Sequence, residues 1–316
     1  MKTKRVTNCL LCDSKKLYLQ EKIQTRSIIQ SWEKQKISVG YLFENVVELD
    51  KMICKNCELV FFSPLIPGDN DFYSQLALQN WYYNHNDKTE FSFSNNYIEE
   101  NDSILDIGSG RGTFKKHIKK NIDYTGLELS SNAVHLATKD NINVVEQTIE
   151  SYSEKNLNKH DVAVAFQVLE HITNIESFIK SSIKAIKPLG FLIIAVPNND
   201  SFIKDAFNNL LNSPPHHTIQ WNEKSLTFLA KKYDLNVVEI YKEQVTKIHK
   251  DWYFSTTVNK FLRNILNLKT KSFNVNISDR IINKIASIIS KLWVFKNSYK
   301  NKFGHTILIV MQKSKE

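Results

Sequence analysis

The sequence predicts an α/β fold with a mostly parallel sheet, a small metal-binding module ahead of it and a helical insertion before the last strand. Three observations lead to this prediction. Short apolar runs alternate with helical patterns between residues 103 and 198, three closely spaced glycines follow the first run, and two Cys-x-x-Cys pairs precede it. The 316 residues, 42% hydrophobic and 24% charged, fit a globular core with appendages and exclude a disordered chain.

The formal net charge of +9 permits an acidic partner, but the lysines are spread along the chain. We therefore expect solvated basic faces and no specific nucleic-acid partner. The basic start, Met1 to Arg5, is not followed by an apolar signal segment, and no run approaches the roughly 18 apolar residues of a spanning helix. These features predict a cytoplasmic protein.

All the cysteines of the chain lie near its start, as the pairs Cys9–Cys12 and Cys54–Cys57. Two matched pairs of this spacing direct four thiolates at one tetrahedral metal, which leaves no open position for catalysis. Strand-like runs at 46–49 and 59–62 complete the pattern of a zinc-ribbon-like module over residues 1–67. We expect structural Zn²⁺ at these cysteines, with a thiol redox pair or metal-free thiols as the alternatives.

Residues 68–98 are predicted to form a linker with helical cover, rich in asparagine and aromatic side chains. Phe72, Tyr73 and the run Trp81–Tyr83 have two interpretations. They cover a ligand pocket, or they pack the cysteine module against the core. We favour the packing role.

The parallel sheet is predicted to begin with the buried strand 104–107, which carries Asp106 near its carboxyl end. Three glycines follow at alternate positions, Gly108, Gly110 and Gly112, and a helix begins at Phe114. Glycine allows a sharp turn and a close approach of the backbone to a ligand, and the helix start offers N–H groups to a polar group. Gly112 comes one residue too early for a dinucleotide fingerprint, and no triphosphate-binding Gly-Lys-Ser/Thr is present.

The second strand, 124–128, ends in Glu128, whose carboxylate could accept both hydroxyls of a ribose. The alternation then continues to residue 232, and two further apolar runs follow it. The predicted strands are 142–146, 161–166, 189–196, 235–241 and 306–311, and the predicted helices are 133–139, 174–187, 200–211 and 222–232.

The glycine segment Asp-x-Gly-x-Gly-x-Gly at 106–112 resembles motif I of the class I S-adenosylmethionine-dependent methyltransferases. Gln-Val-Leu-Glu-His-Ile at 167–172 and the segment 187–198 resemble the sugar and small-molecule branch of that family. The resemblance covers 103–198 and implies a Rossmann-like, seven-stranded, mostly parallel sheet. The implied core is 99–244 and 304–316, with a helical insertion at 245–303.

The same resemblance implies S-adenosylmethionine as the cofactor and a set of residues that contact it. These residues are Asp106, Gly108, Gly110, Gly112, Glu128, Leu129, Thr148, Ile149 and Gln167. Thr148 departs from the family, which commonly has an acid at the adenine edge.

The cysteine pairs resemble those of sugar C-methyltransferases, which carry a further C-terminal domain of their own. This chain has room only for an insertion and a final strand, so O- or N-methylation is at least as well supported. We expect methylation of a hydroxyl on a sugar or glycan precursor. The alternatives are a quinone-like or lipid-linked acceptor, and a binding protein that holds the cofactor without turnover.

Three histidines are candidates for removing a proton from the acceptor. His171 follows the fourth strand, where it could face the methyl group, and we prefer it as the base. Because neighbouring side chains diverge, we expect Glu170 not to orient it. His216 and His217 follow two prolines on a loop over the same edge and are assigned to substrate binding or proton transfer. A metal site at this His-His pair lacks a nearby acid.

Isoleucines recur at helical spacing between residues 278 and 298, with lysines beside them. This helix either meets an anionic membrane surface or is covered by protein, as a lid or in a homodimer.

Overall fold

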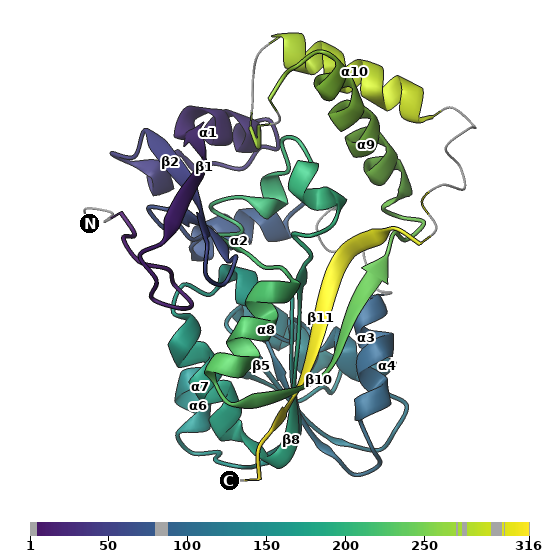
Figure 1. The fold of residues 1–316 in the computed structure, drawn as a ribbon. Coiled ribbons are helices and arrows are strands. Elements are labelled where there is room, and N and C mark those ends of the chain that lie inside the picture. The colour runs from purple at the N-terminus through teal and green to yellow at the C-terminus, as the bar shows by residue number, and fades with distance from the viewer. Residues whose placement is uncertain are drawn as a thin grey trace.

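A computed structural model describes residues 5–79, 88–269, 271–273, 277–291, 299 and 301–315. A large sheet forms the centre of the molecule, a smaller sheet adjoins it, and two helices project beyond (Figure 1). Trp81–Tyr83 and residues 292–298 of the predicted insertion helix lie outside the described residues.

The large sheet has seven strands in the order β10-β11-β8-β7-β4-β5-β6. These strands are β4 (Ser103–Ile107), β5 (Asp123–Glu128), β6 (Val144–Glu146), β7 (His160–Phe166), β8 (Ile186–Pro197), β10 (Leu235–Gln244) and β11 (Phe303–Lys313). Strand β11 runs antiparallel to both of its neighbours, β8 and β10, and the other pairings are parallel. The predicted seven-stranded, mostly parallel sheet is therefore confirmed, and the apolar run 307–311 is fully buried between two strands.

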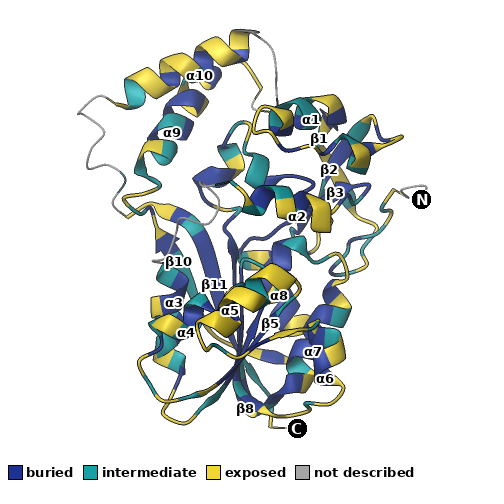
Figure 2. Cartoon of the chain, turned by 180° about the vertical axis from the view of Figure 1, so that it is seen from behind, coloured by how far each residue is buried: buried dark blue, intermediate teal, exposed yellow. Residues whose placement is uncertain are grey.

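Helices cover both faces of this sheet, because successive side chains of a strand point to opposite sides. In β7, Ala163 and Ala165 share one apolar cluster with α6, α7 and α8, whereas Val162 and Val164 pack with α3 and α4 on the other face. These helices are α3 (Thr89–Ser94), α4 (Thr113–His117), α6 (Ile149–Ser153), α7 (Ile175–Ala185) and α8 (Glu223–Lys232); α5 (Ser131–Lys139) lies beside β5 and β6. The residues on the outer faces of these helices are exposed, and those that face the sheet are buried (Figure 2).

The helix predicted at 200–211 is wrong. The segment forms two 3₁₀ turns, η4 (Phe202–Asp205) and η5 (Leu210–Asn212). Side chains compete for the backbone here: Asn198 Oδ1 accepts from the N–H of Asp200, and Ser201 Oγ accepts from the N–H of Ile203. Such local bonds replace the regular i to i−4 pattern of an α-helix.

The cysteine module belongs to a four-stranded antiparallel sheet in the order β1-β2-β3-β9. Its elements are β1 (Leu17–Gln24), α1 (Thr25–Glu33), η1 (Gly40–Phe43), β2 (Glu48–Cys54), β3 (Val60–Ser63) and α2 (Asn70–Ala77). Strand β9 (Ile219–Gln220) comes from the core part of the chain and pairs with Val60 and Phe61. Sequence patterns did not indicate β9, because a strand of two residues has no readable periodicity.

The insertion forms a hairpin of α9 (Lys250–Ile265) and α10 (Ile277–Ser290), at the top of Figure 1. A buried ion pair between Arg263 and Asp279 joins the two helices. Side chains of α10 that face away from α9 are exposed, namely Ile281, Ile285 and Ile288. None of the helices in the described residues has the length and apolar character needed to cross a membrane.

The remaining short elements are the 3₁₀ turns η2 (Asn95–Tyr97) and η3 (Leu169–His171). Turn η3 follows β7 directly, so its side chains lie at the carboxyl ends of the parallel strands, where ligands of open α/β sheets bind.

Candidate functional site

The three glycines form the turn between β4 and α4, and all three have positive φ: +73° at Gly108, +56° at Gly110 and +75° at Gly112. A Cβ at Gly108 would lie 2.5 Å from Val168 Cγ2, and a Cβ at Gly112 would lie 2.6 Å from Ile142 Cγ2. A Cβ at Gly110 meets no atom within 4 Å among the described residues. Two glycines are therefore needed for packing, and Gly110 faces open space that a ligand can approach.

Glu128 lies at the end of β5 beside this turn. Its Oε2 accepts a 2.9 Å hydrogen bond from Gly110 N, and its Oε1 accepts 2.8 Å bonds from the N–H groups of Leu129 and Ser130. These bonds orient the carboxylate, and each of its oxygens can accept up to two bonds, so Oε2 retains capacity for a ribose hydroxyl. Leu129 is 62% exposed, as a side chain that lies against an adenine would be.

Asp106 is buried at the end of β4. Its Oδ2 accepts a 2.6 Å hydrogen bond from the Tyr124 hydroxyl. Burial raises the pKa of Asp106 to about 7, because a low-dielectric environment disfavours the charged form.

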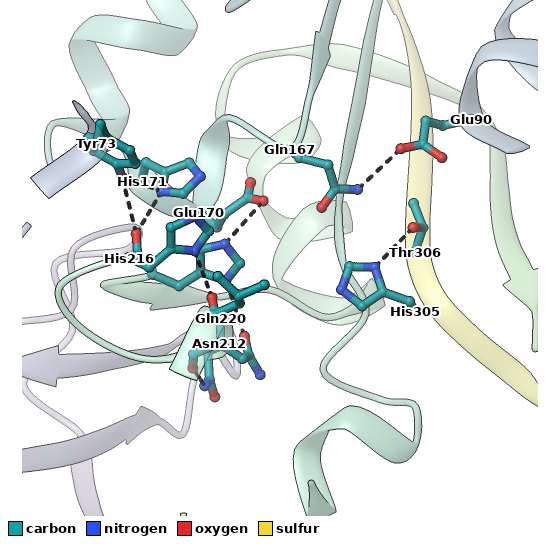
Figure 3. A network of polar contacts seen from close by, with 12 residues as sticks. Tyr73, Glu90, Gln167, Glu170, His171, Asn212, His216, Gln220, His305 and Thr306 are labelled. Atoms are coloured by element: carbon teal, nitrogen blue, oxygen red, sulfur yellow. Dashed lines mark hydrogen bonds and ion pairs between the residues drawn. The ribbon is translucent and has the colours of Figure 1, made fainter. Parts of the chain in front are cut away.

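Thr148, Ile149 and Gln167 lie along the same edge of the sheet. The Thr148 hydroxyl caps α6 by accepting from Ser151 N, and Ile149 is buried in the core. Gln167 has a left-handed backbone (φ 58°), and its side chain donates to Glu90 Oε1 at 3.5 Å (Figure 3). The cofactor contacts of these three residues stay predictions. Because the Ile149 side chain is buried, its backbone is the part that could contact an adenine.

The four cysteines converge as predicted, with all Sγ atoms within 4.8 Å of one another. The shortest separations are 3.4 Å for Cys9–Cys57 and 3.5 Å for Cys12–Cys54. Four sulfurs about 2.3 Å from a tetrahedral zinc lie about 3.8 Å apart, so this cluster could hold Zn²⁺. A hydrogen bond from Cys57 lowers the pKa of Cys9 to about 5, which favours the thiolate that a metal requires.

The two Cys-x-x-Cys segments fold into matching turns. Asp13 N donates to Cys9 O at 3.0 Å and Glu58 N donates to Cys54 O at 2.9 Å, with positive φ at Asp13 and Glu58. The cluster packs into the apolar core that also contains Trp221 of the core domain. The cysteine module is therefore anchored to the part of the molecule that contains the large sheet through shared packing.

The predicted histidines meet in one cluster, in which His216 and His217 are buried and His171 is partly buried, although 45 residues separate His171 from His216 (Figure 3). Ring centroids are 4.7 Å apart for His171–His216, 4.8 Å for His171–His217 and 4.4 Å for His216–His217. Burial lowers the pKa of His171 to about 4 and the pKa values of His216 and His217 well below the usual range. All three rings are therefore neutral at pH 7.

Backbone contacts hold the histidine loop against the module and against η3. Gly68 N donates to Pro215 O at 2.7 Å, Phe62 N donates to Thr218 O at 3.1 Å, and Thr218 N donates to Glu170 O at 3.3 Å. The Pro214–Pro215 peptide is cis. The cysteine module thus contributes to the position of the loop that carries His216 and His217.

The expectation that this histidine pair lacks a nearby acid is wrong. Glu170 is 1% exposed, and its Oε1 lies 3.7 Å from His217 Nε2. Its carboxyl group is directed at the proline-histidine loop. Burial raises the pKa of Glu170 to about 8.

Sequence patterns gave Tyr73 a pocket role only as the less favoured of two interpretations, and they did not mark Glu243. The Tyr73 hydroxyl lies 2.9 Å from His171 Nδ1, so Tyr73 reaches the site while Phe72 beside it packs on Trp32. Glu243, at the end of β10, accepts from the N–H groups of His305 and Thr306. No local motif marks Glu243, because its partners His305 and Thr306 reach this edge only through the antiparallel insertion of β11 between β8 and β10.

A family model described as "Methyltransferase domain" matches residues 79–240, slightly more than half of the chain. Ubiquinone biosynthesis O-methyltransferase of Rickettsia bellii is 34% identical over 102 residues, which are 30% of this chain and 42% of that protein. The protein of the same description from Aliivibrio fischeri is 28% identical over 118 residues, 33% of this chain and 50% of that protein. The chain spans about half or less of the length of these relatives.

Among solved structures, a SAM-dependent methyltransferase from Archaeoglobus fulgidus superposes with a TM-score of 0.48 at 17% identity, covering 71% of this chain and 92% of that one. A possible histamine N-methyltransferase from Thermotoga maritima superposes with a TM-score of 0.47 at 15% identity, covering 72% and 88%.

Proposed function

We propose that this chain, which belongs to the methyltransferase domain family and is an S-adenosylmethionine-dependent methyltransferase, methylates a hydroxyl group of a sugar or glycan precursor. The observation that carries the proposal is the contact between the glycine turn and the segment that leads to the histidines. Gly108 packs against Val168, and the next turn carries Glu170 and His171. The open space at Gly110 and the oriented carboxylate of Glu128 fit the ribose end of the cofactor.

Methyl transfer from a sulfonium is an in-line displacement, so alignment of acceptor oxygen, methyl carbon and sulfur supplies most of the rate. A hydroxyl acceptor must also lose its proton. A buried group of three neutral histidines at the carboxyl ends of the strands suits both tasks, because it hydrogen-bonds the acceptor and promotes deprotonation.

A quinone-like or other lipid-borne hydroxyl is the second candidate acceptor. Both relatives named above are described as ubiquinone biosynthesis O-methyltransferases, and helix α10 exposes Ile281, Ile285 and Ile288 beside basic side chains. We propose that this face, within the predicted contact segment 278–298, brings the enzyme to an anionic membrane surface. Replacing all three isoleucines by serine is expected to abolish sedimentation with anionic vesicles. Equal sedimentation of the variant would instead assign the face to protein contact, such as a homodimer.

The test supplies methyl-labelled S-adenosylmethionine with a panel of nucleotide sugars and, separately, with a lipid-linked glycan and quinone-precursor extract. Label recovered in water supports the sugar acceptor, and label recovered in the organic phase supports the lipid-borne one. If neither phase gains label while the cofactor binds, neither class of acceptor is methylated and the proposal is refuted.

A further inference from the structure

The histidine cluster has a geometry that a proton acceptor alone does not require. One ring nitrogen from each of His171, His216 and His217 lies within 4.8 Å of the other two. Imidazole nitrogens bind a metal at about 2.1 Å, so nitrogens of a tetrahedral site lie about 3.4 Å apart. Side-chain shifts that shorten these separations by at most about 1.4 Å would close the site around an ion.

The Nδ1 atom of each ring is directed at an oxygen. His171 Nδ1 lies 2.6 Å from His216 O, His216 Nδ1 lies 2.8 Å from Leu211 O, and His217 Nδ1 lies 3.4 Å from Asn212 Oδ1. Carbonyl oxygens accept hydrogen bonds and cannot donate them, so Nδ1 carries the proton and the lone pair of the neutral ring is on Nε2. Metal-binding histidines are oriented in this way, through a hydrogen bond from the nitrogen that does not bind the metal.

A buried carboxyl group lies beside this donor set. Glu170 is 1% exposed, and neither of its carboxylate oxygens has a hydrogen-bond partner among the residues that the structure describes. Its Oε1 approaches His217 Nε2 to 3.7 Å. Burying a carboxylate without a partner costs free energy, and a cation beside it would offset that cost.

We propose that His171, His216 and His217 bind one divalent transition-metal ion, with the Glu170 carboxylate beside it and one coordination position open, and that this ion is separate from the metal of the four cysteines. Three imidazoles and one carboxylate suit Zn²⁺, Fe²⁺ or Mn²⁺ better than Ca²⁺ or Mg²⁺, which prefer sites built from oxygens.

The role of the ion rests on the proposed function. A divalent ion that holds the acceptor oxygen lowers the pKa of the hydroxyl. The proton passes to water, the new oxygen–methyl bond forms as the methyl–sulfur bond breaks, and S-adenosylhomocysteine leaves. In this arrangement His171 is a metal ligand, and the ion takes over the task that the sequence assigned to His171 as base.

The test uses full-length protein whose cysteine site has been loaded with Zn²⁺, then titrated with Co²⁺ under equilibrium dialysis. Wild type is expected to bind one additional Co²⁺ per chain, with visible bands that lack sulfur-to-cobalt charge transfer. Glu170→Gln and His217→Ala are each expected to weaken that binding at least tenfold. His160→Gln is the matched control, because His160 is also buried but bonds to Ser103 and Tyr152 outside the cluster.

Glu170→Gln preserves side-chain shape, and circular dichroism with thermal unfolding verifies that each variant is folded. The proposal is overturned if wild type binds no ion beyond that of the cysteines, or if both variants bind Co²⁺ as wild type does. This binding assay needs neither cofactor nor acceptor. A second bound ion without methylation of any hydroxyl would therefore refute the proposed function alone. Methylation by a protein that binds no second ion would refute the metal site alone.

Discussion

The substitution Gly110→Ala is expected to reduce cofactor affinity strongly while it changes folding stability only slightly. Gly110 has a φ of +56°, and a Cβ there meets no atom within 4 Å among the described residues. Gly110→Ala is therefore expected to lower the free energy of unfolding by only about 1 kcal/mol, the cost of a left-handed backbone for alanine. The new methyl group occupies space beside the carboxylate of Glu128, so we expect affinity for S-adenosylhomocysteine to fall at least tenfold.

Gly108→Ala is the matched control, since its φ of +73° imposes the same backbone cost. Its Cβ would also lie 2.5 Å from Val168 Cγ2, and such overpacking adds about 1–3 kcal/mol. The expected total loss is about 2–4 kcal/mol, with an effect on folding rather than on ligand contact.

Urea unfolding without ligand measures the first quantity, and isothermal titration calorimetry measures the second. A ligand at 100 times its Kd stabilises wild type by about 2.7 kcal/mol, and a tenfold weaker Kd reduces this to about 1.4 kcal/mol. The cofactor site is misplaced if Gly110→Ala binds S-adenosylhomocysteine as wild type does. The packing reasoning fails if Gly110→Ala and Gly108→Ala lose equal stability without ligand.

Three further predictions follow from charge, burial and metal binding. Glu128→Gln removes the charged carboxylate that would accept the ribose hydroxyls, so we expect it to weaken S-adenosylhomocysteine binding roughly 10- to 100-fold. Calorimetry measures this affinity, and the surface substitution Glu146→Gln is expected to leave it unchanged. Burial lowers the pKa of His160 to about 4, so the folded protein keeps this ring neutral, whereas the unfolded chain protonates it below about pH 6.5. The free energy of unfolding is therefore unaffected above pH 6.5 and falls by about 3 kcal/mol as the pH approaches 4. Urea titrations across this range should show a shallower pH slope for His160→Gln, and an unchanged slope would mean that another group dominates. The double change Cys54→Ser and Cys57→Ser is expected to remove zinc measured by mass spectrometry and to lower unfolding stability by several kcal/mol; retention of one zinc per chain would contradict a four-cysteine site.

The cofactor side of the site could be predicted from sequence because its parts are close along the chain. A strand, a glycine turn and a helix occupy residues 103–117, and the next strand lies beside the first and ends in Glu128. Parallel pairing of consecutive strands places their carboxyl ends at one edge, so Gly110 and Glu128 had to meet. The four cysteines were predictable for a similar reason, since each pair forms one local turn.

The histidine side of the site could not be predicted to the same extent. Backbone bonds from Phe62 and Gly68 hold the loop of His216 and His217, and neither contact has a sequence signature. The orientation of Glu170 is a further example. Its position after β7 indicates the correct edge of the sheet, but whether it reaches the histidines depends on where a distant loop is held.

The amino-acid sequence by itself determined the α/β core, the cysteine cluster and the cofactor turn, because hydrophobic periodicity, glycine conformation and thiol spacing act over a few residues. Only the tertiary structure decided that His171, His216, His217 and Glu170 share one buried site. It also decided that the cysteine module joins the core through β9. Both outcomes depend on contacts between segments that are far apart along the chain, and such contacts are selected by the packing of the whole fold rather than by any local pattern.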